Sequence, residues 1–451
     1  MHGRRSSFDP MVAADQILCF SESGTITWGT FAEDVAAFEA QLDEVSDVCN
    51  MLPDRYGFMA ALAASLKHSR GTVLPPHTAP EAVAAALQHA ESPLVLHDRP
   101  LSLDANASGT EHGAARLFDD LRHATTPITV FTSGTTKSPR RHTKTWNILA
   151  SGAAITATIL RSLDLPPGRT ALIGTTPHQH MYGLEATIFA ALAHGYPIFR
   201  GTPFYTADFE AAREAARRAG FDSIVLVTSP AHLRYLERAV LESADVRAVI
   251  SATAPLPLSL AERLEVRGDL SVMEIYGSTE TGSMALRRTT DGPLWSLEAG
   301  FSLEETPSGW LAHAPHLPEP VPLGDDVSVE PDGRFSLVGR VGDMVSVHGK
   351  RISLAALNLI LDETPGLKDG VVLHLPNEDG DRLAIAAVRD GAHAASDDTF
   401  RSEIRQHFDR RCDPVFIARR IVFVDALPRS PTGKISAADL THLAEAIGFT
   451  K

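Results

Sequence analysis

Short apolar runs alternate with longer amphipathic stretches through most of the chain. The apolar runs are rich in β-branched residues and predict buried strands; they are ITVFTS, TALIGTT, SIVLVTS, VRAVIS and LSVMEIYG, which begin at residues 128, 170, 223, 246 and 270. The stretches DFEAAREAARRAG (208–220) and SPAHLRYLERAVLESA (229–244) carry apolar residues at helical spacing. This alternation predicts an α/β fold whose mostly parallel sheets are flanked by helices.

The pattern changes from about Leu311. Residues 314–343 are rich in Pro, Gly and Asp, and PDGR (331–334) is a strong turn signal. A second, smaller unit follows, with helices in LAALNLILDETPG (354–366) and around 402–409, and strands in GVVLHLP (370–376), LAIAAVRD (383–390) and RRIVFVDALP (419–428). We therefore predict a large N-terminal domain, residues 1–340, and a small mobile C-terminal α+β domain, residues 341–451. Gly339 and Gly342 give the backbone freedom to swing at the joint.

Composition narrows the class of protein. The 451 residues are 44% hydrophobic and 22% charged, as in a soluble globular protein, and the net charge of −15 argues against a nucleic-acid-binding surface over the whole chain. The three cysteines are far apart and form no CxxC pair, which argues against a disulfide framework or a zinc site and favours a reducing cytoplasm. No signal peptide or transmembrane helix is predicted.

Two stretches that follow predicted strands have candidate chemistry. FTSGTTKSPR (131–140) gathers hydroxyls and backbone amides without bulky side chains, as a phosphate cradle requires; the alternative is a Ser/Thr-rich surface turn, and it is not a Walker loop. EIYGSTETGS (274–283) offers a flat face for a base at Tyr276, a donor at Thr279 and an oxygen ligand for Mg²⁺ at Glu280. Its alternative is a hairpin turn with a helix cap at Ser278 or Thr279.

Two further motifs lie towards the C-terminus. Asp325 in LGDDV follows a glycine and could accept both hydroxyls of a ribose, and Arg340 stands at the predicted joint; the alternatives are a turn aspartate and a surface arginine. LPRSPTGKIS (427–436) holds Lys434 on a loop bounded by Pro and Gly, where the alternative is a solvated lysine.

The ordered set of these motifs resembles the adenylate-forming superfamily: acyl- and aryl-CoA synthetases, adenylation domains of peptide synthetases, and luciferases. The resemblance runs from TITWGTFAEDVAAFEAQL (25–42) to Lys434. It implies that a carboxylate attacks the α-phosphate of ATP, that pyrophosphate leaves, and that a thiol then takes the acyl group. The large domain would thus bind ATP and the acid.

The resemblance also implies roles for individual residues. Five residues of the first loop would hold the β- and γ-phosphates: Thr132, Ser133, Gly134, Thr135 and Thr136. Tyr276 would stack on adenine, with Glu274 near its amino group, and Asp325 would bind the ribose with Arg340 beside it. Thr279 would contact the α-phosphate, and Glu280 would hold Mg²⁺. Ser251, Ala252, Thr253 and Gly277 would border the adenine and acyl pockets.

The small domain would carry the catalytic Lys434, which bridges the carboxylate and the α-phosphate where negative charge builds. The same domain would then rotate and present Gly349 and Lys350 to the arm of the thiol acceptor. That acceptor, CoA or a phosphopantetheinyl acyl carrier protein, is expected to be separate, because no carrier motif follows Lys434.

Several positions depart from the superfamily pattern. Lys137 replaces a glycine and Arg140 a lysine in the phosphate loop, and Gly342 replaces the usual Asp or Lys at the hinge. SATAPL (251–256) stands where a double glycine is usual, so Ala252 and Thr253 are expected to narrow the pocket.

The stretch TTPHQHMYGLEATIFAALAHG (175–195) bears on the acid. A histidine at the position of His180 lines the acid pocket in acyl- and aryl-CoA ligases, and His178 and Tyr182 could bond a ring hydroxyl; the alternative is a histidine that caps or packs at a helix start. Members that activate amino acids carry an aspartate in this stretch, which pairs with the α-ammonium group. No aspartate is present here, so an α-amino acid substrate is disfavoured, and only Glu185 could take that role.

The segment PHQHMYGLE (177–185) is similar to the corresponding segment of the aromatic-acid ligases of bacterial aryl-polyene and xanthomonadin pigment clusters. We therefore expect an enzyme that activates a hydroxybenzoate-like acid. Two alternatives remain open: a short- or medium-chain acyl-CoA synthetase, and a catalytically silent ligand-binding homologue.

Overall fold

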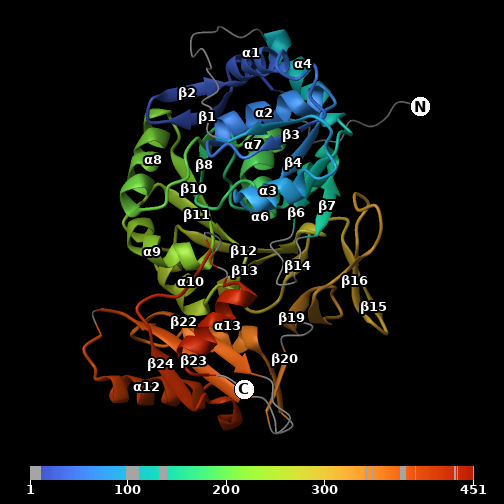
Figure 1. Ribbon diagram of the computed structural model, residues 1–451. Coiled ribbons are helices and arrows are strands. Elements are labelled where there is room, and N and C mark those ends of the chain that lie inside the picture. Colours follow the sequence, from blue (N-terminus) through green and yellow to red (C-terminus); the bar gives the residue numbers. More distant parts are fainter. Residues whose placement is uncertain are drawn as a thin grey trace.

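The computed structural model describes residues 12–97, 111–131, 140–340, 344–347, 350–375, 382–391, 393–430, 433 and 435–449. A large N-terminal domain and a smaller C-terminal domain, drawn in orange and red, are distinct in Figure 1. Within the described residues, each cluster of buried apolar side chains lies either before residue 340 or after residue 344, so the two domains have separate cores. The predicted α/β class with a small second domain is confirmed. The boundary at 340/341 stays a prediction.

A nine-stranded sheet is the centre of the large domain. In spatial order its strands are β14 (Ser296–Leu297), β13 (Gly282–Arg288), β12 (Ser271–Ser278), β11 (Val246–Ser251), β10 (Ser223–Thr228), β8 (Thr170–Gly174), β9 (Ile198–Phe199), β1 (Ile17–Ser21) and β2 (Gly24–Thr27). The six strands from β12 to β1 are parallel, while β13, β14 and β2 add antiparallel edges. Parallel strands buried on both faces need continuous apolar runs, which explains why β8, β10, β11 and β12 could be predicted from the sequence.

A second sheet of five strands lies beside the first. Its order is β5 (Pro93–Leu96), β3 (Asp47–Asn50), β4 (Gly71–Leu74), β6 (Ile128–Phe131) and β7 (Arg141–Lys144). Only β7 is antiparallel, and it pairs with β6 from Ile128–Lys144 to Phe131–Arg141.

Helices cover both faces of the nine-stranded sheet (Figure 1). The helices of the large domain are α1 (Trp28–Glu39), α2 (Arg55–Lys67), α3 (Pro80–Ala86), α4 (Glu111–Arg122), α5 (Trp146–Ser162), α6 (Met181–Gly183), α7 (Ala190–His194), α8 (Thr206–Arg218), α9 (Pro230–Leu241) and α10 (Leu258–Glu265). Apolar residues of α8, α9 and α10 pack on one face of the sheet, and those of α1, α2, α5 and α7 fill the core on the other.

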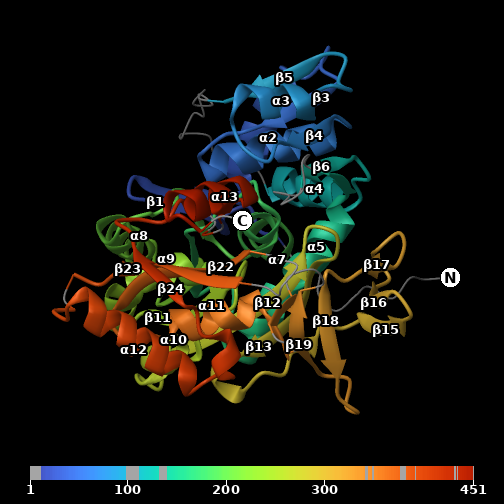
Figure 2. The same ribbon diagram turned by 60° about the horizontal axis from the view of Figure 1, so that its bottom comes forward.

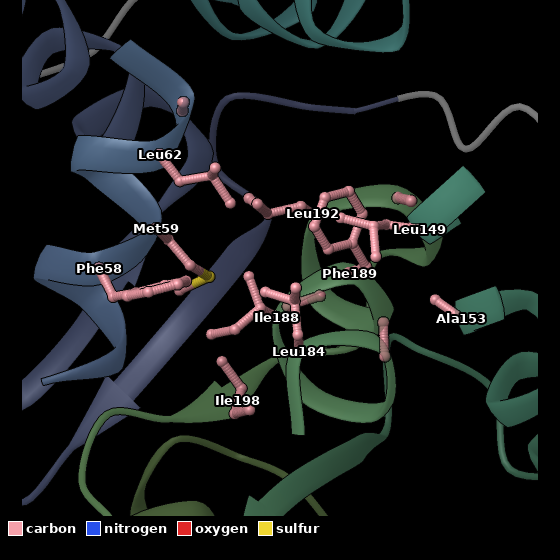
Figure 3. Close-up of a cluster of buried hydrophobic side chains, with 14 of the residues drawn as sticks. Phe58, Met59, Leu62, Leu149, Ala153, Leu184, Ile188, Phe189, Leu192 and Ile198 are labelled. Carbon is pink, nitrogen blue, oxygen red and sulfur yellow. The ribbon is translucent and has the colours of Figure 1, made fainter. Parts of the chain in front are cut away.

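One segment inside that core is a π-helix, Leu184–Phe189, which continues directly into α7. Figure 3 shows its side chains Leu184, Ile188 and Phe189 packed between α2 and α5. All six of its residues are buried. A π-helical turn inserts one extra residue and often marks a functional position.

The rest of the large domain consists of short antiparallel strands, as the Pro- and Gly-rich texture predicts. They are β15 (Ser302–Thr306), β16 (Gly309–His313), β17 (Val321–Pro322), β18 (Asp325–Val329) and β19 (Phe335–Arg340). A short 3₁₀ turn, Thr289–Asp291, precedes them.

The C-terminal domain has a three-stranded sheet in the order β22 (Leu367–Leu375), β23 (Arg382–Arg389), β24 (Arg420–Phe423) and a hairpin of β20 (Met344–Val347) and β21 (Lys350–Ser353). Its helices are α11 (Leu354–Asp362), α12 (Asp397–Asp409), α13 (Ala437–Ala446) and a 3₁₀ turn, Pro414–Phe416. Figure 2 shows this domain in front of the large domain. The two domains meet where Arg234 Nη2 of α9 lies 2.9 Å from Asp362 Oδ2 of α11.

A wholly buried arginine fixes one end of the large sheet. Arg55, the first residue of α2, donates to the carbonyl oxygens of Gly174, the last residue of β8, and of Thr176, each at 2.9 Å. It also donates to Gly201 O and Thr202 Oγ1. Burial lowers the pKa of Arg55 to about 10, so the group is still charged at neutral pH. The charge therefore stabilises the backbone where the predicted acid-binding stretch begins.

Candidate functional site

Four parallel strands bring the candidate loops to one edge of the sheet. β8, β10, β11 and β12 are neighbours, so the loops after Gly174, Thr228 and Ser251 and the turn after Ser278 leave the sheet on the same side. In open α/β sheets, ligands bind outside the carboxyl ends of the strands. This edge is therefore the candidate site.

The motif EIYGSTETGS forms a tight antiparallel hairpin between β12 and β13. A Cβ atom on Gly277 would lie 2.1 Å from the carbonyl oxygen of Gly282, so only glycine allows the two strands to approach this closely. Within the tip, Ser278 Oγ accepts from the amides of Glu280 and Thr281, at 3.2 and 3.1 Å. The backbone of this motif thus forms the hairpin turn that was the alternative to a binding loop. Thr279 and Glu280, both half-buried, lie at the tip of the hairpin.

Two residues of β7 contact Glu280 from the other sheet. Lys144 Nζ donates to the carbonyl oxygen of Glu280 at 2.7 Å, and His142 Nε2 lies 3.6 Å from Glu280 Oε1. Burial lowers the pKa of both His142 and Lys144, while the carboxylate of Glu280 opposes this. The side chain of Glu280 is 38% exposed, so its carboxylate is within reach of a metal ion.

The structure brings together two residues predicted to face a nucleoside. Tyr276 donates its hydroxyl to Asp325 Oδ2 at 2.8 Å, and its ring packs on Trp295 and Phe335, with centroids 5.6 and 5.8 Å away. Asp325 is also the cross-strand partner of Arg340 in the pairing of β18 with β19. An aromatic ring, a carboxylate and an arginine position therefore meet beside the strand ends.

Glu274 has a role that the sequence did not reveal. It is buried, and its Oε1 accepts from the amide of Leu256 at 2.9 Å while its Oε2 accepts from Arg287 Nε at 2.7 Å and Thr289 Oγ1 at 2.9 Å. Both oxygens are thus occupied in joining the 252–256 loop to the hairpin. Its contact with an adenine amino group stays a prediction.

The SATAPL loop contains a strained residue. Ser251 and Ala252 are buried, and Thr253 has φ +80°. A β-branched residue with positive φ is a genuine outlier, because its side chain crowds the backbone. This strained residue lies in the segment where the adenylate-forming superfamily usually has a double glycine.

In the histidine stretch, His178 and Tyr182 hydrogen-bond to backbone carbonyl oxygens, whereas His180 stands at the start of α6. His178 is buried, its Nε2 lies 2.9 Å from Leu52 O, and burial lowers its pKa to about 3. Tyr182 donates its hydroxyl to Ile250 O at 2.8 Å, and burial raises its pKa. His180 stands at the N-cap position of α6 and is half-buried, but its side chain makes no capping hydrogen bond, so its role at the acid stays a prediction.

Several predicted residues lie outside the described parts of the chain; they are Thr132, Ser133, Gly134, Thr135, Thr136, Lys137, Gly342, Gly349 and Lys434. Lys350, at the start of β21, is exposed, and its ammonium pairs with Asp413.

The family profile described as AMP-binding enzyme matches residues 11–306, more than half of the chain. The chain belongs to this family. Among curated relatives of this AMP-binding enzyme, the 4-coumarate–CoA ligase of Cereibacter sphaeroides is 27% identical over 310 residues, 68% of this chain and 70% of its own. A probable CoA ligase of Humulus lupulus is 24% identical over 371 residues, 71% of this chain and 64% of its own.

Solved structures share the fold. The anthranilate CoA ligase AuaEII in complex with anthranoyl-AMP has a TM-score of 0.73 at 17% identity, covering 96% of this chain and 95% of its own. A benzoate CoA ligase from Burkholderia xenovorans LB400 has a TM-score of 0.72 at 17% identity, covering 95% and 97%. The family match and the CoA-ligase relatives together show that the protein is an AMP-forming acid–thiol ligase. No helix in the described residues is long and apolar enough to cross a membrane.

Glu185, on the π-helix, is a buried residue that the sequence left open only as a partner for an α-ammonium group. Only 1% of it is exposed, and its Oε2 accepts from the amide and the hydroxyl of Ser283, at 2.8 and 2.6 Å. Burial raises the pKa of Glu185 to about 7, although Ser283 and Lys144 oppose the shift. Its carboxylate therefore bonds the hairpin inside the protein, which removes the option of an α-ammonium partner.

We predict that Thr253→Gly stabilises the protein by about 1 kcal/mol, because glycine adopts φ +80° without the crowding that a β-branched side chain suffers. The measurement is the urea-unfolding midpoint of the large domain. Ala252→Gly is the matched control: Ala252 has no positive φ, so this change should destabilise by about 0.5–1 kcal/mol. A loss of stability in Thr253→Gly equal to that of the control would contradict the strain.

We predict that Glu185→Gln gains stability over the wild type as pH rises. Below about pH 4.5 the carboxyl is protonated in both folded and unfolded chains; above it the unfolded chain ionises first, so wild-type stability falls until pH passes about 7. The stability of the variant minus that of the wild type should rise by about 2 kcal/mol between pH 5 and pH 8. Denaturation at five pH values measures this difference, and a flat profile would contradict the raised pKa.

Proposed function

We propose that the protein activates an aromatic carboxylic acid of the hydroxybenzoate type with ATP, releases pyrophosphate, and passes the acyl group to a phosphopantetheine thiol of an acyl carrier protein or CoA. The single observation that carries the proposal is the meeting of Tyr276, Asp325 and the Glu280 hairpin at one edge of the parallel sheet. The relatives and fold neighbours support the aromatic class, since they include coumarate, anthranilate and benzoate ligases.

The nucleotide would lie against Tyr276, with its ribose hydroxyls on Asp325 and with Ser251, Gly277 and the loop at 132–136 around it. The chemistry of these groups fits, because a carboxylate accepts two hydroxyl donors at once. Thr279 would donate to the α-phosphate from the hairpin tip.

A divalent cation would lie at Glu280. Among the described residues no three His, Cys, Asp or Glu side chains gather as a metal cluster. Mg²⁺ does not need such a cluster, since one or two carboxylates and the substrate phosphates hold it. When bound, Mg²⁺ neutralises phosphate charge as the adenylate forms.

The acid would lie between the SATAPL loop and the histidine stretch. Ala252 and Thr253 add bulk to this loop, and Tyr182 is tied to Ile250 O in the strand that leads into it. A short, flat acid suits such a pocket better than a long acyl chain. His180 would face the acid from the start of α6.

The small domain, which we place from residue 341 onward, would supply Lys434 to the reacting carboxylate and α-phosphate. Its position against α9 supports this proposal: a Cβ on Gly433 would lie 2.8 Å from Ala231 Cβ in the first turn of α9, directly after β10. Arg429 also donates to Gly433 O at 2.8 Å and pairs with Asp369. Gly349 and Lys350 would serve the thiol arm in the second step.

We predict that pyrophosphate release with Mg-ATP is strongest with one hydroxybenzoate in a panel of benzoates, cinnamates, fatty acids and amino acids. Release with fatty acids alone would favour a short- or medium-chain acyl-CoA synthetase. Silence with every acid, while ATP still binds, would favour a catalytically silent homologue.

Two variants test the assigned roles in the same assay. Lys434→Ala and Glu280→Gln should each lower the rate by roughly 10²–10³-fold, as the loss of one preorganised charge typically does. Glu280→Gln should also raise the Mg²⁺ concentration that gives half-maximal pyrophosphate release. Unchanged release in Lys434→Ala, or an unchanged Mg²⁺ requirement in Glu280→Gln, would contradict the respective role. Lys67→Ala is the control, because its ammonium pairs with Glu39 far from the strand ends.

A further inference from the structure

Glu185 is an acidic residue in a wholly buried π-helix whose other members, apart from Thr187, are apolar. Its neighbours Leu184, Ile188 and Phe189 face α2 and α5, as Figure 3 shows, and every residue of the π-helix is buried. Burial of a carboxylate costs several kcal/mol unless hydrogen bonds and opposite charge compensate. Packing alone therefore does not explain an acid here.

The surroundings of Glu185 leave space for a carboxylate. A Cβ on Gly152 of α5 would lie 1.9 Å from Glu185 Oε1, and one on Gly282 would lie 2.6 Å from the same oxygen. Two glycines from different elements thus make room for the acid. The hairpin gains two hydrogen bonds in return, from the amide and the hydroxyl of Ser283 to Glu185 Oε2.

Lys144 contacts the same hairpin from the opposite sheet. It is only 4% exposed, and its ammonium donates to Glu280 O, three residues before Ser283. Glu185 Oε2 accepts from the Ser283 amide at 2.8 Å, so two ionisable groups of opposite sign act on one hairpin. The two residues therefore hold the hairpin at two points, Lys144 from β7 and Glu185 from the π-helix.

We propose that Lys144 and Glu185 form a clamp that sets the position of the hairpin tip, so that both act as positioning residues for Glu280. The proposal rests on the proposed metal-binding role of Glu280. Neither residue touches substrate. A clamp of charges fixes one geometry, because each group must meet its partner to offset its burial, whereas apolar contacts tolerate small shifts.

The test compares Lys144→Met and Glu185→Gln at pH 8. Each variant should raise the Mg²⁺ concentration for half-maximal pyrophosphate release by roughly tenfold, the effect expected when one hydrogen bond to a charged group is lost. The KM for the acid should change less than twofold. Because the two residues act on one hairpin tip, their effects should not be independent. The fold increase in the Mg²⁺ requirement of the double variant should therefore be smaller than the product of the two single fold increases.

Tyr56→Phe is the matched control. It removes another buried hydrogen bond of the large domain, from the Tyr56 hydroxyl to Asp34, without touching the hairpin. It should lower stability and leave the Mg²⁺ requirement unchanged. Should Glu185→Gln or Lys144→Met not fold, Ser283→Ala takes their place, because it deletes one of the two bonds to Glu185 and should raise the Mg²⁺ requirement about threefold.

Hydrogen exchange at the amide of Ser283 gives a readout that needs no activity. The amide of residue 283 should exchange at least tenfold faster in Lys144→Met and Ser283→Ala than in the wild type. Its exchange should be unchanged in Tyr56→Phe. Faster exchange with a raised Mg²⁺ requirement supports the clamp. An unchanged Mg²⁺ requirement in folded variants, or unchanged exchange at Ser283, overturns it. If the wild type itself releases no pyrophosphate, the proposed function fails, while exchange at Ser283 alone still decides whether the clamp exists.

Discussion

The parallel pairing of β8, β10, β11 and β12 is the constraint on which the site depends. Parallel strands must all end on one side, so the sheet gathers the histidine stretch, the SATAPL loop and the hairpin tip although they are distant in sequence. The antiparallel addition of β13 then turns the chain back at that edge and leaves Thr279 and Glu280 at the tip. Loops held by a rigid sheet in this way can position reacting groups without being rigid themselves.

Buried charged side chains add further links between the loops and the elements around them. Arg55 fixes the backbone after β8, Glu274 ties the 252–256 loop to the hairpin, and Lys144 and Glu185 hold the tip. Each of them bonds backbone groups of another segment, so each adds a link beyond the strand pairing. These side chains lie behind the groups proposed to meet substrate, which suits a site whose geometry must be set before binding.

Much of the fold could be predicted from the sequence, because its signals are local. The β-branched run of β10 and the helical spacing of α8 gave elements within about two residues of those observed. The helix α12 begins at Asp397 rather than near 402, because its first turn is acidic; the cap at Ser396 was the signal that could have located it. The π-helix at Leu184 could not be predicted, since an extra residue in a wholly buried run disturbs no polar pattern.

The candidate site was predictable only in part. The resemblance named Tyr276 and Asp325, which the structure joins by a hydrogen bond. It did not reveal the internal bonds of Glu274, or that Glu185 faces Ser283, because such contacts join residues far apart in sequence and depend on how sheet and helices pack. The strain at Thr253 was also hidden, since a backbone angle leaves no mark on composition.

The most direct test of the central claim is mass spectrometry of the protein after incubation with Mg-ATP and a hydroxybenzoate in the absence of any thiol. The account predicts a bound hydroxybenzoyl-adenylate in a one-to-one ratio with released pyrophosphate. Release of ADP and phosphate instead, or an adenylate formed only from aliphatic acids, would contradict it.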